Sequence, residues 1–118
     1  MIITQSPFRM SFIGGGSDLP DFYEQEMGAV LSATINHYMY VSSHPFFNKN
    51  HIRLKYSKTE TVDQLNDIHH PIFREVLTQF DVKGGLEISS NADIPSGTGL
   101  GSSSSFTVNV LLNLYARH

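Results

Sequence analysis

The sequence has no cysteine, little charge and no long apolar run. Without cysteine there is no disulfide framework and no thiolate metal site. Met1–Pro7 lacks the basic start and extended apolar segment of a signal peptide, and no stretch approaches the length of a membrane span. Charged residues make up 16% of the chain and the net charge is −3, which disfavours a nucleic-acid partner held by phosphate contacts. We therefore expect a soluble cytoplasmic protein without a membrane or nucleic-acid partner.

The first half of the chain predicts strands. A chain of 118 residues, 40% of them hydrophobic, can bury about two thirds of its surface around one core. Strands are expected at 2–4 and 10–13, on either side of the turn-prone Ser6-Pro7. Two adjacent strands are expected within 29–43, with a turn near Asn36-His37.

The second half predicts strands and helices. Ile52–Tyr56 alternates apolar with basic residues, as a half-exposed strand does. Ser57–Glu60 has the form of a capping box that would open a short helix, and Pro71 would begin a longer one. Leu86–Ser90 follows as the last strand and Ser103–Ala116 as the last helix. The expected order is β-β-β-β-α-α-β-loop-α, one α+β domain over 1–118 in which a mixed or antiparallel sheet packs on helices.

Glycines 97, 99 and 101 alternate with other residues just before the last helix, and serines 102–105 follow. Glycine lets the backbone turn through positive φ and lets a ligand approach the main chain. A helix opening from such a loop directs its unpaired N–H groups and its positive dipole end into the loop, which makes a phosphate cradle. The spacing excludes a Walker A loop. It also excludes a dinucleotide fingerprint, because that motif would need a glycine at position 102, where the sequence has serine. Composition alone leaves an ordinary Gly/Ser surface loop as an equal alternative.

The last helix is apolar on nearly every side. Only Asn109, Asn113 and Arg117, spaced four apart, form a thin polar stripe. Such a helix is typical of a domain interior, and no glycine or proline stop signal follows it. We therefore expect the chain to be the front part of a longer protein, without its C-terminal domain. We also expect the isolated chain to self-associate through this helix.

Several other groups allow both a structural and a functional interpretation. Gly14-Gly15-Gly16-Ser17-Asp18 could be an ordinary turn, with Asp18 capping a short helix over 21–25, or a place where the backbone approaches a ligand. His51, His69 and His70 lack the spacing of a metal site, and solvated loop positions are expected for them. Tyr38 and Tyr40 alternate along a strand, and we expect them to pack.

Two motifs closely resemble those of the GHMP kinases, a superfamily that includes galactokinase, homoserine kinase and mevalonate kinase. Residues 95–104 follow the family's phosphate loop, which is Pro, three residues and Gly-Leu-Gly/Ser-Ser-Ser-Ala, and depart from it only at Ser104. Residues 7–18 are similar to the family's first motif, with matches at Pro7, Arg9, Gly14 and Asp18. Two glycines replace the Glu-His pair of galactokinases, and this Gly-Gly-Gly-Ser-Asp-Leu-Pro version resembles the D-glycero-D-manno-heptose 7-phosphate kinase branch.

The resemblance implies an enzyme that uses ATP and Mg²⁺. It would transfer the γ-phosphoryl group to the anomeric hydroxyl of a sugar phosphate, D-glycero-D-manno-heptose 7-phosphate, in the making of nucleotide-activated heptose. The alternatives are another GHMP small-molecule kinase and a non-catalytic module that binds a nucleotide or a sugar phosphate.

By their match to the motifs, Arg9 would stabilise charge at the reacting centre and Ser103 would ligate Mg²⁺. Gly16, Ser17 and Asp18 would bind the sugar. In the family, the catalytic aspartate and the acidic magnesium ligand lie beyond the second motif. Neither Asp93 nor Glu87 is therefore predicted to be the base. The isolated chain is therefore expected to be inactive. The ATP-binding loop would comprise Pro95, Gly97, Thr98, Gly99, Leu100, Gly101, Ser102, Ser103 and Ser104.

Overall fold

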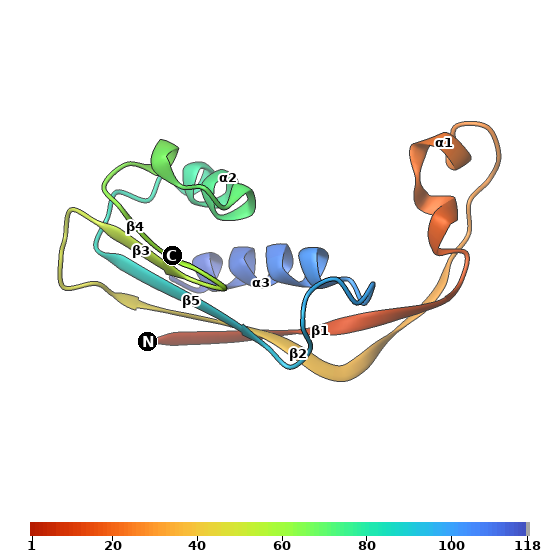
Figure 1. The fold of residues 1–118 in the computed structure, drawn as a ribbon, viewed down its shortest axis with the longest axis horizontal. Coiled ribbons are helices and arrows are strands. Elements are labelled where there is room, and N and C mark those ends of the chain that lie inside the picture. Colours follow the sequence, from red (N-terminus) through yellow and green to blue (C-terminus); the bar gives the residue numbers. More distant parts are fainter. Residues whose placement is uncertain (118) are drawn as a thin grey trace.

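The computed structural model describes residues 1–117, which form one five-stranded sheet with helices on one of its faces (Figure 1). The strands lie in the order β1-β2-β5-β3-β4; β3 and β5 are parallel and the other neighbours antiparallel. The predicted α+β domain with a mixed sheet is confirmed. The strand bounds are β1 Ile2–Ile13, β2 Leu31–Pro45, β3 Ile52–Lys55, β4 Thr59–Val62 and β5 Leu86–Ala92.

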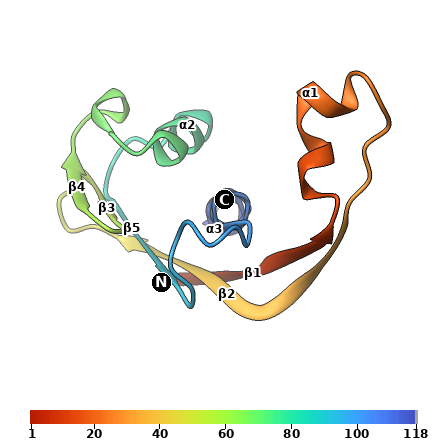
Figure 2. The same cartoon turned by 45° about the vertical axis from the view of Figure 1, so that its right-hand side comes forward.

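Helices α2 (Pro71–Gln79) and α3 (Ser102–Arg117) cover the same face of the sheet, side by side in both views (Figures 1 and 2). The core lies between these two layers. In β3 the alternation is as predicted, with Ile52 and Leu54 buried and the alternating Arg53 and Lys55 half-buried on the other face. Within residues 1–117, none of the helices is long and apolar enough to cross a membrane. The fully buried apolar side chains of the core are those of Phe8, Val41, Ile52, Leu54, Ile68, Phe73, Leu77, Leu86, Ile88, Val110 and Leu114.

The first two strands are longer than predicted. β1 and β2 are each continuous, and their distal halves pair only with each other, forming an arm that carries η1 (Gly15–Asp18) and α1 (Pro20–Tyr23) (Figure 1). The predicted turn at Pro7 is wrong because β1 is an edge strand, where a residue without an N–H is tolerated. The predicted turn at 36–37 is a bulge, since Pro7 pairs with Tyr38 and Arg9 with Thr34.

The capping box predicted at 57–60 is also wrong. Glu60 lies in β4, opposite Leu54 of β3, and the expected helix is reduced to a 3-10 turn, η2 (Leu65–Asp67). The Glu60 carboxylate accepts hydrogen bonds from the backbone N–H groups of His69 (2.7 Å) and His70 (3.3 Å), just before α2. The Glu60 side chain, which was expected to cap a helix in its own segment, instead connects the β3–β4 hairpin to the start of α2.

Helix α3 lies on the sheet with two of the three residues of its polar stripe inward, whereas the third, Arg117, is exposed. Asn109 and Asn113 are fully buried, whereas Val108 and Tyr115 are more than half exposed. The Asn109 amide donates to the Met39 carbonyl (2.7 Å) and the Asn113 amide to the Val41 carbonyl (3.0 Å). We call this contact the polar seam; its members are Thr4, Ser6, Ser43, Ser105, Asn109 and Asn113, which link α3 to β1 and β2.

Candidate functional site

The Gly/Ser loop lies between β5 and α3, as predicted, and α3 begins one residue earlier than expected, at Ser102. Ile94 and Leu100 pack against the core, whereas 95–99 are exposed. Glycines 97, 99 and 101 have φ of +83°, +75° and +76°, a conformation that side chains disfavour. At Gly97 and Gly99, no atom lies within 4 Å of the place that a Cβ would take. The loop is thus anchored at both ends and open to a ligand between them.

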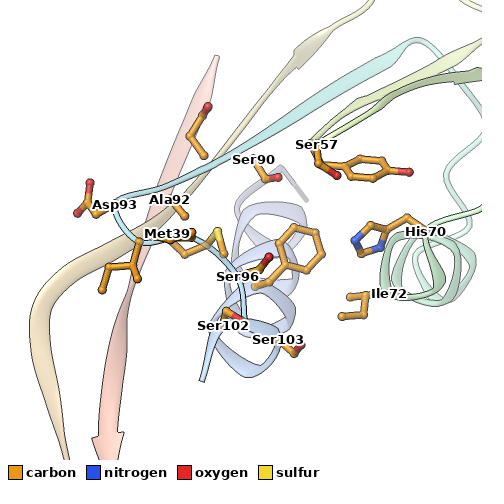
Figure 3. Close-up of a pocket in the computed structure, with 15 residues that line it drawn as sticks. Met39, Ser57, His70, Ile72, Ser90, Ala92, Asp93, Ser96, Ser102 and Ser103 are labelled. Atoms are coloured by element: carbon orange, nitrogen blue, oxygen red, sulfur yellow. The ribbon is translucent and has the colours of Figure 1, made fainter. Parts of the chain in front are cut away.

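The first turn of α3 supplies donors to this loop. The Ser105 N–H donates to the Gly101 carbonyl (2.9 Å), so the N–H groups of 102–104 precede the hydrogen-bond ladder of the helix and face the loop. The Ser103 side chain is exposed at the edge of the adjacent cavity (Figure 3). Within residues 1–117, no cluster of three His, Asp or Glu side chains could hold a metal. One hydroxyl fits Mg²⁺ only together with phosphate oxygens, so the ion would have to arrive with a nucleotide.

Arg9 of β1 lies against the loop. Its backbone N–H donates to the Leu100 carbonyl (3.0 Å), and its guanidinium donates to the Ser11 hydroxyl (3.2 Å). The side chain is half-buried and runs past Gly101, close enough that a Cβ there would lie 3.0 Å from the Arg9 Cγ. The fold therefore brings a residue of the first motif into contact with the second motif, 91 positions later (100 minus 9).

A cavity of about 560 Å³ opens beside the loop (Figure 3). One wall comes from the β3–β4 turn and the start of α2, with Tyr56, Ser57 and His70. The other comes from Phe106 and the first turn of α3, and the segment 90–96 connects them. The volume lies within the range of small-molecule sites. The cavity is therefore large enough for the part of a nucleotide that the loop does not hold.

The chemistry of the wall is set by Glu60, which the sequence analysis misassigned. Burial favours a higher pKa for the Glu60 carboxyl, but hydrogen bonds from Tyr56 and from the backbone of His69 and His70 outweigh it and lower the pKa. The hydrogen bond to Glu60 in turn raises the pKa of Tyr56 to about 12. Neither group therefore titrates near neutral pH.

His70 is not the solvated loop residue that was predicted. It is the N-cap of α2, where its Nδ1 accepts from the Phe73 N–H (3.4 Å), and its ring packs against Tyr56, Phe73 and Phe106. Burial lowers the pKa of His70, so the ring is neutral at the cavity wall. The following Pro71 could have identified it as an N-cap, because proline favours the first helical position. Its place at the cavity depends on the tertiary fold.

The two acids nearest the loop in sequence are both engaged elsewhere. The Asp93 carboxylate accepts from the Tyr38 N–H (2.9 Å), and the Asp93 N–H donates back to the Tyr38 carbonyl (3.0 Å). Glu87 lies on the sheet face away from α3, in ion pairs with Lys55 (2.9 Å) and His44 (3.2 Å). Asp93 lines the cavity but is bonded to the backbone of Tyr38, and Glu87 is bound in its ion pairs.

The first motif ends in a second, smaller cavity of about 290 Å³ on the arm, lined by Ser17, Asp18 and Tyr23 together with 28–30. The Ser17 hydroxyl lies 2.7 Å from both the Gly14 and the Ala29 carbonyls and accepts from the Ala29 N–H (2.9 Å), which closes the arm's loop. The Asp18 side chain is exposed. Within residues 1–117 it makes no hydrogen bond or ion pair, so its oxygens are available to a ligand.

The sequence is similar to known proteins in the regions that contain the two motifs. Residues 66–117 match the family described as "GHMP kinases N terminal domain". The chain is 30% identical over 124 residues to D-glycero-alpha-D-manno-heptose 7-phosphate kinase of Campylobacter jejuni subsp. jejuni serotype O:2, and the match covers 93% of this chain. The resemblance inferred from the motifs is thus confirmed.

Solved structures share the fold. A D-glycero-D-manno-heptose 1-phosphate kinase from Bacteriodes thetaiotaomicron superposes with a TM-score of 0.79 at 23% identity, over 94% of this chain. The mevalonate kinase of Methanococcus jannaschii superposes with a TM-score of 0.73 at 18% identity, over 98% of this chain. The chain spans 36% of the length of the curated relative and 40% of each of these two structures.

Proposed function

Since residues 66–117 match the family described as "GHMP kinases N terminal domain" and the chain shares the fold of solved sugar kinases, we propose that the protein is an ATP-dependent kinase of a small sugar phosphate. The acceptor we propose is the anomeric hydroxyl of D-glycero-D-manno-heptose 7-phosphate, in a cytoplasmic route to nucleotide-activated heptose. Two observations support this choice: the Gly-Gly-Gly-Ser-Asp-Leu-Pro segment at 14–20 and the 30% identical relative that carries this substrate in its name.

The observation that carries the proposal is the contact between Arg9 and the Gly/Ser loop. Phosphoryl transfer requires mainly positioning and neutralisation of the charge on the transferred group. A fixed cation beside a loop of open backbone donors meets both needs. The half-buried arginine beside Gly101 therefore favours an anion-binding loop over an ordinary surface loop.

In this proposal the loop binds the ATP phosphates through its backbone, and the 560 Å³ cavity takes the nucleoside. The neutral His70 ring and Phe106 would form apolar walls for the base. Mg²⁺, held by Ser103 and the phosphate oxygens, would neutralise charge on the transferred group. Arg9 would stabilise the charge that develops there.

The sugar would bind at the 14–18 turn on the arm. The Asp18 carboxylate would accept hydrogen bonds from sugar hydroxyls, and Gly16 would leave room for the sugar, because a Cβ there would have no neighbour within 4 Å. Ser17 would act through its backbone, since its hydroxyl is occupied by Ala29 and Gly14.

The test is a coupled assay of ADP release by the full-length gene product, with the heptose 7-phosphate, galactose and mevalonate as acceptors. We expect turnover with the heptose phosphate alone. Gly99→Val should abolish ATP binding, because a branched side chain would fill the phosphate space. Ser103→Ala should raise the Mg²⁺ concentration needed for activity. The matched control is Ser104→Ala, because alanine is the residue that the family pattern has at this position.

A second candidate is a non-catalytic module that binds a nucleotide or a sugar phosphate. It is favoured by the engagement of both Asp93 and Glu87, the two acids nearest the loop in sequence, in contacts within the fold. ATP binding without turnover of any acceptor by the full-length protein would establish this alternative. Unchanged ATP affinity in Gly99→Val would contradict both candidates.

A further inference from the structure

The three glycines of the loop differ in what surrounds them. Their φ values lie within 8° of one another, so the backbone requirement is the same at each. A Cβ added at Gly97 or Gly99 would find no atom within 4 Å, whereas one at Gly101 would lie 3.0 Å from Cγ of Arg9 and 3.3 Å from both its Cζ and its Nε. Of these three glycines, only Gly101 has another side chain, that of Arg9, against the position where its own Cβ would lie.

Arg9 is held by three contacts around this point. Its backbone is joined to the loop by the hydrogen bond to the Leu100 carbonyl (3.0 Å), its side chain crosses the Cα of Gly101, and its guanidinium donates to Ser11 (3.2 Å). Ser11 in turn lies beside Gly15, whose Cβ would be 3.7 Å from the Ser11 Cβ. Arg9 therefore extends from the phosphate loop towards the turn that carries Asp18.

We propose that Gly101 is a positioning residue that sets the place of the Arg9 guanidinium. This inference rests on the proposed kinase function only for its catalytic consequence; the packing is independent of it. A methyl group at 101 would meet Cγ, Nε and Cζ of Arg9 at 3.0–3.3 Å, so the arginine side chain would have to give way by a few tenths of an ångström. Because the Arg9 backbone is fixed to Leu100, that shift falls on the side chain and moves the guanidinium from the position in which the proposed kinase would use its charge.

The test compares Gly101→Ala with Gly97→Ala in the full-length protein. Both place alanine at a φ near +80°, so the backbone strain is matched and only the first variant meets Arg9. We expect kcat of Gly101→Ala to be about tenfold lower than that of Gly97→Ala, because displacing a reacting group by up to ~1 Å can cost about a hundredfold. The KM for the sugar phosphate should be similar in the two variants.

A double-mutant cycle identifies Arg9 as the cause. In an Arg9→Ala background, Gly101→Ala should lower kcat and the thermal midpoint no more than Gly97→Ala does, because its steric partner is gone. Effects of Gly101→Ala that add fully to those of Arg9→Ala would overturn the proposal. If Gly101→Ala fails to fold, the Arg9→Ala/Gly101→Ala protein should fold; failure of both would equally overturn it.

A measurement without turnover separates this inference from the kinase assignment. In ¹⁵N-labelled, nucleotide-free protein, the Nε–H signal of Arg9, assigned by its loss in Arg9→Ala, should shift in Gly101→Ala and stay in place in Gly97→Ala. A shift in an inactive protein would leave the positioning role intact and remove the kinase assignment. An unmoved signal in an active protein would refute the positioning role alone.

Discussion

The inward orientation of α3 can be tested by replacing Asn113 with alanine. The Asn113 amide donates to the Val41 carbonyl (3.0 Å), the Thr4 hydroxyl (3.1 Å) and the Ile2 carbonyl (3.3 Å), and its oxygen accepts from the Ser43 hydroxyl. Ser43 has no exposed surface. Truncation would leave its hydroxyl without this acceptor, which costs about 1–3 kcal/mol, and each other lost bond contributes about 1 kcal/mol. Because the amide has two protons for these three acceptors, it contributes about two full hydrogen bonds, and we expect a destabilisation of roughly 3–5 kcal/mol.

Leu112→Ala is the matched control. Leu112 is the neighbouring residue of the same helix and is 48% exposed. Its truncation should cost less than about 1 kcal/mol, because little apolar surface is lost from the interior and alanine favours helix. If α3 were instead rotated so that Leu112 faced the sheet and Asn113 faced solvent, the order would be reversed, since truncation of a buried leucine costs about 2–5 kcal/mol.

The assay is urea denaturation followed by circular dichroism. With a slope of roughly 1–3 kcal/mol per molar urea, Asn113→Ala should lower the midpoint by about 1 M or more, and Leu112→Ala by much less. The Ser43→Ala/Asn113→Ala protein should be more stable than the sum of the single effects predicts, because the stranded hydroxyl is absent. A larger loss for Leu112→Ala than for Asn113→Ala would refute the reasoning.

Three further predictions concern the arm, the ion pairs and the outer face of α3. Asp18→Ala should weaken sugar-phosphate binding by about 1–3 kcal/mol and leave ATP binding unchanged in the full-length protein; equal loss for both ligands, measured by calorimetry, would make Asp18 a turn residue. The hydrogen bond from Lys55 lowers the pKa of Glu87, so this carboxylate stabilises the fold above its unfolded pKa of about 4.3 and loses that contribution as the pH falls through the folded pKa. A profile of unfolding free energy between pH 2 and 6 should therefore be flatter in Glu87→Gln. An unchanged profile would contradict the pairing. The 118-residue chain alone should be inactive and should self-associate through exposed α3 side chains such as Leu112, more weakly in Leu112→Asp; a clean monomer in sedimentation, or sugar-dependent ADP release, would contradict this expectation.

Local glycine and proline signals predicted the elements that position the site. Alternating glycines placed the loop to within one residue, and Pro71 placed the start of α2. The misassignments have a common cause, which is that a partner distant in sequence decides the structure. Pro7 continues a strand because that strand is at the edge of the sheet. Glu60 lies in a strand that pairs with β3, and its carboxylate accepts a hydrogen bond from the His69 N–H before α2. Such partners leave no trace in a local pattern.

The connections within the candidate site could not be predicted from the sequence. The motifs predicted Arg9 and the loop as site residues, and the fold adds that they are in contact. The cavity wall was missed, because Tyr56 and His70 are brought to it by the Glu60 hydrogen bonds. For α3, the spacing of Asn109 and Asn113 showed that they share one face. It could not show that this face meets backbone carbonyls of the sheet.

The polar seam has a consequence for the length of the phosphate loop. A helix held by apolar contacts can slide by a residue and repack, but a one-residue slide rotates the helix by about 100° and would separate the amides of Asn109 and Asn113 from their carbonyls. The start of α3 is therefore fixed relative to the sheet. An insertion or deletion in the nine residues between Ala92 and Ser102 cannot be absorbed by moving the helix. It would have to distort the loop itself, so this segment should tolerate changes of residue far better than changes of length.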